Sequence, residues 1–439
     1  MQHTDMRLPV DTTQPSALPK KVIYILGRAR TSPKIVRWTF LLFAFTIPFE
    51  TVNLEALPGA SSLARLAGLL FFSTCLLYPK VYFRRPPQAL WWFTGFASVS
   101  VLRAFFIPEQ LVDQFISEIQ TFVQLLVLCW FGSTLLQEEK NVRHTLLTFL
   151  IATLLVAIGL FLGLPGFSQM MGERLSFVGA NPNSFAVLMA LGAQGLIGFG
   201  IEQIRRNIWR RVRFIALSLV PLAAMVYTGS RGGIIAFLAG VAVYALPYRS
   251  SKRKMAAILG VTIAVVGVVY TVVNDEDTLS RFKSSYETGD TAGRDRLFAG
   301  SIEMISEKPL LGWGAVVWTY ELGARENRGF KHRGSHNLIL DLLLQDGLLG
   351  TIPCLIGLGL CVRQAWKARV HNLGLLLLAW LITMIIASMS GPWLGTKSMW
   401  LVLTLVLASE AFTVKQYKRK NLMIRTILQD IYKRNTSHQ

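Results

Sequence analysis

The sequence is short of charge. Only 16% of its 439 residues are Asp, Glu, Lys or Arg, whereas soluble domains carry about 25%. Hydrophobic residues make up 52% of the chain, and the mean hydropathy is +0.44. This shortage excludes an ordinary soluble domain and predicts an all-α polytopic membrane protein.

Long apolar runs take the place of the missing charge. A spanning helix needs about 20 mostly apolar residues, and by this measure twelve segments are candidate spans. The third is interrupted by Arg103 and Pro108, and the eighth runs only from about Gly232 to Tyr248. The predicted spans are centred near residues 42, 68, 97, 125, 153, 191, 219, 239, 263, 350, 381 and 405.

Cysteine is also scarce, and metal-binding motifs are missing. The four cysteines all lie in apolar runs without a C-x-x-C pair, so we predict that they are buried small hydrophobic residues. No H-E-x-x-H motif occurs, and His332 and His336 are separated by non-helical sequence. We therefore expect no metal and no cofactor. The first thirty residues lack an apolar core, so no cleavable signal peptide is expected.

The charge that is present is strongly basic, with a net value of +20. Lys and Arg alternate between successive loops, with 31 of the 45 on one side of the predicted spans and the other 14 opposite. The positive-inside rule makes the richer side cytoplasmic and places both termini there. The net charge therefore indicates topology and attraction to anionic membrane lipids, and we expect no nucleic-acid partner.

This topology divides the chain into five parts. A cytoplasmic N-terminal segment covers residues 1–33, spans one to nine cover 34–273, and spans ten to twelve cover 338–414. Residues 415–439 form a basic cytoplasmic tail. Residues 274–337 form a long outer loop, in which apolar residues at helical spacing predict a surface helix from Thr291 to Glu307. Candidate functional residues should be sought on this outer face.

The predicted surface helix begins with two arginines, Arg294 and Arg296. A helix dipole disfavours cations in the first turn by about 0.3–1 kcal/mol, so an anion should compensate. The anion could be Asp290 or Asp295, or a bound phosphate held by the guanidinium groups and the free N–H groups of the helix start. Further basic residues are expected to form a mobile rim of the loop, namely Arg325, Arg328, Lys331, His332 and Arg333.

Arg231 lies in the short outer hairpin of residues 228–233. Ser230 is expected to cap the next span, so a phosphate there would meet a guanidinium, a helix N-terminus and a close glycine backbone. Arg231 could instead extend to lipid headgroups. Arg174 is a weaker candidate, because Glu173 offers it a structural partner.

Two further outer residues have open interpretations. Asn183 could simply cap the sixth span. For Arg65, near the outer end of the second span, a structural ion pair is as good an interpretation as a functional role.

His336 stands at the start of the tenth span, with Ser335 as the expected cap. The helix dipole lowers the pKa of a histidine there and favours the neutral imidazole that a general base requires. A surface histidine without a catalytic role is the competing interpretation. Asp341 and Asp346 are costly in lipid, so we expect them to face the protein and to pair with an arginine.

Five short motifs follow one another in this part of the chain. In chain order they are Thr228-Gly229-Ser230-Arg231-Gly232-Gly233, Gly293-Arg294, Leu311-Gly312-Trp313-Gly314, Ser335-His336-Asn337 and Gly347-Leu348-Leu349-Gly350. Together they resemble the signature of bacterial O-antigen ligases and their relatives, over residues 170–350. The relatives include O-antigen polymerases and protein O-oligosaccharyltransferases.

The resemblance implies a glycosyltransferase of the GT-C type in the bacterial inner membrane, metal-independent and inverting, with a periplasmic active site. It would transfer O-antigen glycan from undecaprenyl diphosphate to lipid A-core, with His336 as catalytic base. Diphosphate binding would fall to Arg231, Arg294 and Arg174, and supporting roles to Ser230, Asn337, Arg296 and Asp341.

A transporter of lipid-linked sugars would also have about twelve spans, but its charged residues should lie near the bilayer midplane. The candidate residues here gather at one face instead. The sequence makes no prediction of the sugar, the acceptor hydroxyl or the oligomeric state.

Overall fold

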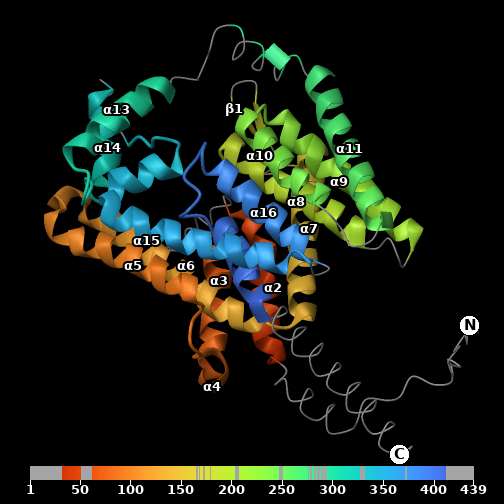
Figure 1. The fold of residues 1–439 in the computed structure, drawn as a ribbon, viewed down its shortest axis with the longest axis horizontal. Coiled ribbons are helices and arrows are strands. Elements are labelled where there is room, and N and C mark those ends of the chain that lie inside the picture. Colours follow the sequence, from red (N-terminus) through yellow and green to blue (C-terminus); the bar gives the residue numbers. More distant parts are fainter. Residues whose placement is uncertain are drawn as a thin grey trace, which may run out of the picture.

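The computed structural model describes residues 32–50, 62–164, 167, 169–171, 174–177, 179–202, 207–246, 251–274, 276, 279–280, 283, 287, 294–326, 332–370 and 373–411. This part of the chain is a bundle of helices with one small β-hairpin (Figure 1). The hairpin pairs β1 (Gln169–Met171) with β2 (Arg174–Ser176) in antiparallel register.

Helices supply the remaining regular structure of the described residues. They are α2 (Lys34–Thr46), α3 (Leu63–Leu76), α4 (Pro79–Tyr82), α5 (Gln88–Leu102), α6 (Val112–Leu135), α7 (Glu139–Phe161), α8 (Pro182–Glu202), α9 (Ile208–Tyr227), α10 (Arg231–Ala242), α11 (Ser251–Asn274), α13 (Arg294–Glu307), α14 (Val317–Arg325), α15 (Leu338–Ala368), α16 (Gly374–Ala387) and a last helix at 397–411. Short 3-10 segments are η1 (Ile47–Phe49), η2 (Arg103–Phe106), η3 (Glu109–Leu111) and η5 (Val243–Ala245).

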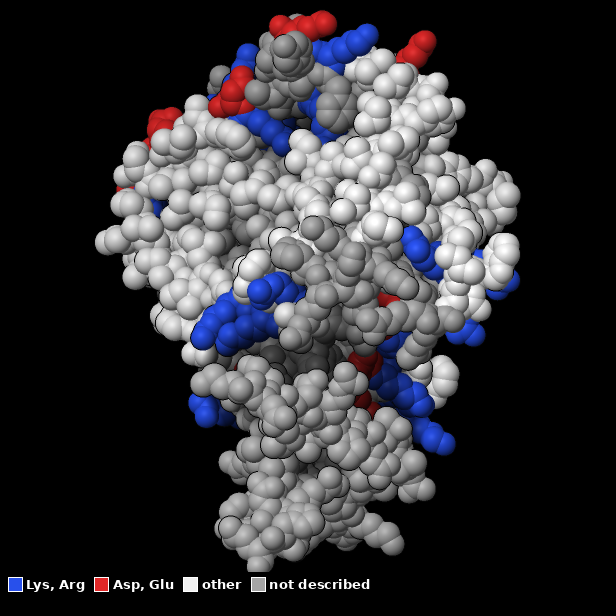
Figure 2. Space-filling model, turned by 45° about the vertical axis from the view of Figure 1, so that its right-hand side comes forward, with Lys and Arg blue, Asp and Glu red and all other residues white. Residues whose placement is uncertain are grey.

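Each predicted span centre falls on one of these helices. Five stretches of the described chain are long and apolar enough to cross a membrane: Gln88–Phe106, Glu109–Leu135, Glu139–Phe161, Pro182–Glu202 and Leu338–Ala368. Shorter apolar helices include Leu63–Leu76 and Gly374–Ala387. Figure 2 shows charged residues at the upper end of the molecule and again below a largely uncharged band. The protein is therefore a helical multi-pass membrane protein, and the count of twelve spans stays a prediction.

The predicted interruption of the third span is present. Helix α5 ends at Leu102, η2 begins at Arg103, and Ile107 is extended because the ring of Pro108 disfavours a helical residue before it. The four cysteines are free and buried, as predicted.

Helix α8 lies at the centre of the bundle, with most of its side chains buried. A Cβ added at Gly192 would lie 2.8 Å from the Thr153 hydroxyl of α7, and one at Gly195 would overlap Leu150. Glycine at these positions lets α7 and α8 approach closely, as small residues do between membrane helices.

A buried glutamine joins three central helices. The amide of Gln194 on α8 donates to the carbonyl of Phe237 on α10 at 2.9 Å and to the hydroxyl of Thr383 on α16 at 2.8 Å. Tyr244 donates to the Gln194 carbonyl at 2.9 Å. Polar groups buried in a membrane protein need such partners, and these join α10, which follows the 228–233 hairpin, to α8 and α16.

Helices α13 and α14 pack over α15 at one corner of the molecule (Figure 1). The predicted surface helix is present as α13, which in the described chain begins at Arg294 and ends at Glu307. Its buried face joins a small apolar cluster consisting of Leu297, Met304, Trp318, Leu322 and Leu344. This corner holds residues 294–326 against α15. His336 lies just before the start of α15.

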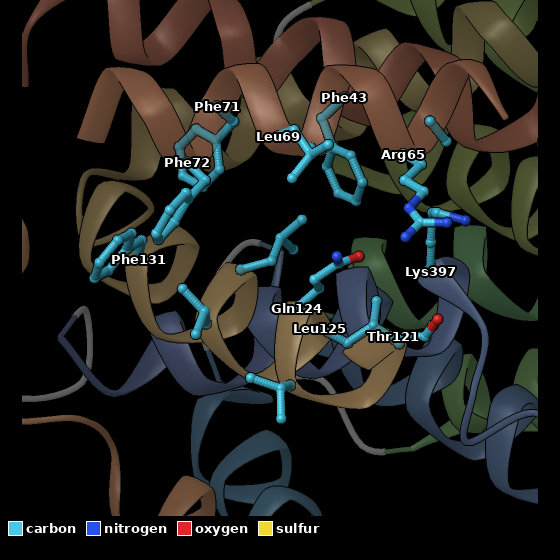
Figure 3. Close-up of a pocket in the computed structure, with 15 residues that line it drawn as sticks. Phe43, Arg65, Leu69, Phe71, Phe72, Thr121, Gln124, Leu125, Phe131 and Lys397 are labelled. Carbon is cyan, nitrogen blue, oxygen red and sulfur yellow. The ribbon is translucent and has the colours of Figure 1, made fainter. Parts of the chain in front are cut away.

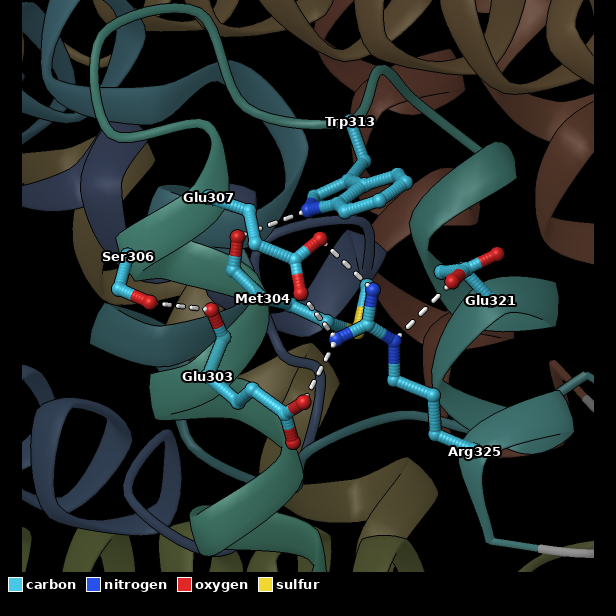
Figure 4. A network of polar contacts seen from close by, with 7 residues as sticks. All are labelled: Glu303, Met304, Ser306, Glu307, Trp313, Glu321 and Arg325. Atoms are coloured by element: carbon cyan, nitrogen blue, oxygen red, sulfur yellow. Dashed lines mark hydrogen bonds and ion pairs between the residues drawn. The ribbon is translucent and has the colours of Figure 1, made fainter.

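The predicted mobile rim is wrong for Arg325. Its guanidinium donates to both Glu307 oxygens, at 2.6 and 2.8 Å, and to Glu321 at 3.0 Å (Figure 4). These charge-assisted bonds hold the Arg325 pKa above its ordinary value. Trp313 lies against this network and donates to the Met304 carbonyl at 2.9 Å. Arg325 therefore joins α14 to α13, whereas Arg328 and Lys331 lie outside the described residues.

Helix α15 is broken at Gly347, whose φ is 58° and ψ is −158°. The segment before α14 supplies backbone partners at the break. Trp313 donates its backbone N–H to the Leu344 carbonyl at 2.7 Å, and Leu348 donates to the Pro309 carbonyl at 2.8 Å. The motif of residues 311–314 thus meets that of residues 347–350. The backbone groups left without helical partners at the break form hydrogen bonds with the main chain of residues 309–314.

Candidate functional site

The hairpin of residues 228–233 ends in the predicted cap. The Ser230 hydroxyl accepts from the Gly233 N–H at 3.2 Å and donates to the Asn183 side chain at 2.9 Å. Arg231 is therefore the first residue of α10, at a helix N-terminus as predicted. Asn183 does not cap α8, because the Asn181 side chain accepts from the Asn183 N–H at 2.9 Å.

Close packing also explains why glycine stands at residues 232 and 233 of the hairpin. A Cβ added at Gly232 would lie 2.7 Å from the Ser390 hydroxyl, and one at Gly233 would lie 2.6 Å from the Ala186 methyl group. The start of α10 is thus clamped between the start of α8 and the segment that follows α16.

Arg294 and Arg231 come together from two helix starts. Arg294 is half-buried at the beginning of α13. Burial and the neighbouring positive charge of Arg231 both lower the Arg294 pKa from its ordinary value. Two neighbouring guanidinium groups that repel each other are candidate ligands for an anion, whose negative charge would offset the repulsion.

The other two predicted anion ligands, Arg296 and Arg174, are not shown beside the arginine pair. Arg296 is exposed on the first turn of α13. Arg174 pairs with Met171 at the end of the β1–β2 hairpin, and its side chain lies outside the described residues, as does Asp290.

His336 lies in the turn that enters α15 and has a positive φ of 59°. Non-glycine residues are uncommon in this region, and such strain gathers at functional sites. The predicted cap is wrong: Asn337, and not Ser335, caps α15, because its side chain accepts from the N–H groups of Ile339 at 3.0 Å and Leu340 at 3.3 Å. His336 is thereby the residue just before the cap.

Ser335 binds Asp341 instead. The buried Asp341 carboxylate accepts from the Ser335 hydroxyl at 2.6 Å and from the Ser335 N–H at 3.1 Å. The predicted pairing of Asp341 with an arginine is therefore wrong, because the hydroxyl and the backbone N–H of Ser335 bind this carboxylate instead. Asp341 faces the protein, as predicted, and it fixes the backbone on the N-terminal side of His336.

Asp346 is also buried and faces the protein, one residue before the break in α15. It accepts from the Ser100 hydroxyl at 2.5 Å and from the Gln345 amide at 3.0 Å, and no ion pair joins it to an arginine among the described residues. Arg103 donates to the Gly312 carbonyl at 3.1 Å. Hydroxyl and amide donors therefore bind the Asp346 carboxylate directly, and the predicted arginine partner acts only as the nearby positive charge of Arg103.

The half-buried imidazole of His336 has a pKa below its ordinary value. Burial is the largest cause, followed by the positive charges of Arg294 and Arg333. The predicted direction is confirmed, but its causes are burial and the two guanidinium groups, and the predicted helix dipole is not among them. A neutral imidazole beside cationic groups can accept a proton.

His336 also lines a cavity of about 550 Å³. Residues of α5, α6, α14, α15 and the 392–395 segment form its walls, and His332 and Arg333 lie in the wall beside His336. Neither Arg231 nor Arg294 belongs to the lining. His336 thus has Arg294 and Arg333 among its electrostatic neighbours and a cavity beside its side chain.

A second cavity, of about 330 Å³, lies between α3 and α6 (Figure 3). Its lining is mainly apolar, with Phe43, Leu69 and Phe72 among the side chains that point into it. Arg65 and Lys397 lie at one end, where Lys397 also pairs with Glu50. This arrangement suits an apolar chain whose polar group lies at the cationic end.

The fold and the candidate site define a helical membrane protein with two neighbouring arginines and a histidine beside a cavity. The family model described as O-antigen ligase matches residues 214–355, and no curated protein matches the chain. This match supports membership of the O-antigen ligase superfamily and a ligase- or polymerase-type glycosyltransferase activity. Arg231, Arg294 and His336 fall inside the match, and Arg174 falls outside it.

Proposed function

We propose that this protein is an inverting, metal-independent glycosyltransferase that joins O-antigen glycan from undecaprenyl diphosphate to lipid A-core. One observation carries the proposal. His336 lies in the electrostatic field of Arg294, and Arg294 lies in that of Arg231, so a base and two anion ligands from three segments form one site.

The arginine pair would bind the diphosphate of the donor. When the bond between the anomeric carbon and the phosphate oxygen breaks, the electron pair stays on the leaving diphosphate. Guanidinium groups placed there offset the growing negative charge, a task given elsewhere to Arg, Lys or a metal. Arg174 would add a third guanidinium from the β1–β2 hairpin, Arg296 would reinforce the α13 start, and Ser230 would hold Arg231 at the α10 start.

His336 would act as general base. Its neutral imidazole would take the proton from an acceptor hydroxyl while that oxygen attacks the anomeric carbon from the face opposite the leaving group. Inversion follows from this single displacement. Asn337 and Asp341 would position the imidazole, since one caps α15 and the other fixes the Ser335 backbone.

The membrane placement completes the proposal. The proposal includes twelve spans and a GT-C arrangement in the inner membrane, as the family resemblance implies. The distribution of Lys and Arg along the sequence supports cytoplasmic termini and a periplasmic site. Both substrates carry lipid chains, and the apolar cavity between α3 and α6 supplies a surface that could bury one.

The test is transfer by the purified protein. Undecaprenyl-diphosphate glycan is offered with lipid A-core, with no second acceptor, or with an unfolded serine-containing peptide, and products are resolved by gel and mass spectrometry. We expect glycan-modified lipid A-core, unaffected by chelator and absent with His336→Ala. If the only product is a donor with a longer glycan, the protein is a polymerase. If the product is glycosylated peptide, the protein is a protein oligosaccharyltransferase. Movement of the donor across proteoliposome membranes without any product would assign a transporter.

A further inference from the structure

A carboxylate in the candidate span Glu109–Leu135 is not explained by the site described so far. Glu118 of α6 is exposed and lines the 550 Å³ cavity that His336 also lines. No hydrogen bond or ion pair joins it to another residue of the described chain. Ionisable residues in membrane spans are costly, so one that faces a cavity without a structural partner points to a ligand.

The rest of the lining indicates which ligand fits. The aromatic side chains of Phe96, Phe122 and Trp318 stand in the walls with the hydroxyl of Thr121 and the amide of Gln345. A sugar ring has an apolar C–H face and a rim of hydroxyls, and it matches a mainly apolar cavity with a few fixed polar groups. The volume lies within the range of about 300–1,000 Å³ usual for small-molecule sites.

The negative charge of Glu118 also decides which substrate is excluded. A diphosphate would be repelled by the Glu118 carboxylate, and the arginine pair is absent from the cavity walls. The arginine in the walls, Arg333, already pairs with Glu326 at 3.5 Å. The hydroxyls of a neutral sugar would instead donate to it. The cavity therefore suits the acceptor sugar, whose hydroxyl gives its proton to His336. The arginine pair suits the diphosphate, which is the leaving group.

We propose that this cavity is the acceptor-sugar subsite and that the Glu118 carboxylate binds hydroxyls of the acceptor sugar, orienting the attacking one toward His336. The proposal rests on the proposed function, because it assigns one of the two substrates of that reaction. It adds α6 to the site and makes Glu118 a determinant of acceptor affinity.

The experiment uses Glu118→Gln, which keeps the shape of the side chain and removes its charge. Glu109→Gln is the matched control, because Glu109 lies before the same helix and outside the cavity lining. Acceptor and donor KM are measured with the purified full chain. Binding of core oligosaccharide, released from lipid A by mild acid, is measured separately by calorimetry without donor.

We expect Glu118→Gln to raise the acceptor KM and the oligosaccharide Kd about ten-fold or more, because a charge-assisted hydrogen bond is lost. Donor KM and the pH profile should stay unchanged, since Glu118 is not among the groups that shift the His336 pKa. Glu109→Gln should behave as the natural protein.

An unchanged acceptor KM and Kd in Glu118→Gln, with normal transfer by the natural protein, would overturn the subsite and leave the proposed function standing. Natural protein that binds the oligosaccharide but transfers no glycan would overturn the proposed function, and the Kd comparison would still decide the role of Glu118. Absence of both binding and transfer by the natural protein would overturn both.

Discussion

Gly312 and Gly347, which are 35 residues apart, approach so closely that a Cβ added at Gly347 would lie 2.6 Å from the Gly312 backbone nitrogen. Gly347 has φ 58° and ψ −158°, a conformation open essentially to glycine alone. The contact holds the break in α15 against the segment that leads into α14. It couples the segment of residues 294–326 to the helix that follows His336.

We therefore expect Gly347→Ala to destabilise the protein by about 1–3 kcal/mol, because the backbone conformation is strained and the new methyl group meets main chain. The measurement is thermal unfolding of the detergent-purified protein. Gly359→Ala is the control in the same helix, since a Cβ there meets nothing within 4 Å. Equal melting temperatures for the two variants would contradict the expected contact.

Arg231→Ala and Arg294→Ala should each lower glycan transfer about ten-fold or more while leaving the protein abundant in the membrane. A hydrogen bond to a charged group contributes about 1.5–3 kcal/mol, and lysine should restore little because it cannot bind a phosphate in a bidentate manner. Transfer is measured with the purified donor, and Arg363→Ala is the control at an exposed position away from the site. Near-normal rates in both alanine variants would remove the arginine pair from the mechanism.

His336→Ala should lose transfer by about 10²–10⁴-fold and keep donor binding, because the imidazole acts on the acceptor hydroxyl. His336→Gly should be equally inactive but more heat-stable than His336→Ala, since only glycine adopts a φ of 59° without strain. Rates and melting temperatures are compared in one preparation. Loss of donor binding in His336→Ala would move this residue to the phosphate site.

The pH dependence follows from the lowered pKa of His336. The base must be neutral, so activity is present above its pKa and is lost as the pH falls through a value below about 6.5. Arg333→Gln removes one positive charge that lowers this pKa, so the pKa should rise and the loss of activity should begin at a higher pH. The profile of kcat/KM between pH 4.5 and 8 checks this, with both proteins equal at the alkaline end. An unshifted acid limb would show that Arg333 does not act on the base.

The proposed topology is checked with two single cysteines. Ser306→Cys on α13 should react with a membrane-impermeant thiol reagent added from the periplasm, and Lys367→Cys near the end of α15 should not. The four native cysteines are buried, so they should give a low background. The reverse labelling pattern would place the candidate site on the cytoplasmic side.

Local features of the sequence were sufficient for the helices. Apolar runs located the helices at each of the twelve predicted centres, and the serine of the 228–233 hairpin was recognised as the cap of α10. These features depend on neighbours within one or two helical turns, which a pattern records directly. The same is true of the break before Pro108, which proline chemistry dictates.

The composition and motifs of the sequence by themselves determined the membrane class, the helix positions and the residue types of the candidate site. The tertiary structure alone decided that Asn337 caps α15, that Asp341 binds Ser335, and that Arg333 acts on His336. It also placed Glu118 beside the cavity and Gly312 against Gly347. These outcomes required the structure because each depends on a side chain's direction or on segments far apart in sequence, and packing of the whole chain sets both.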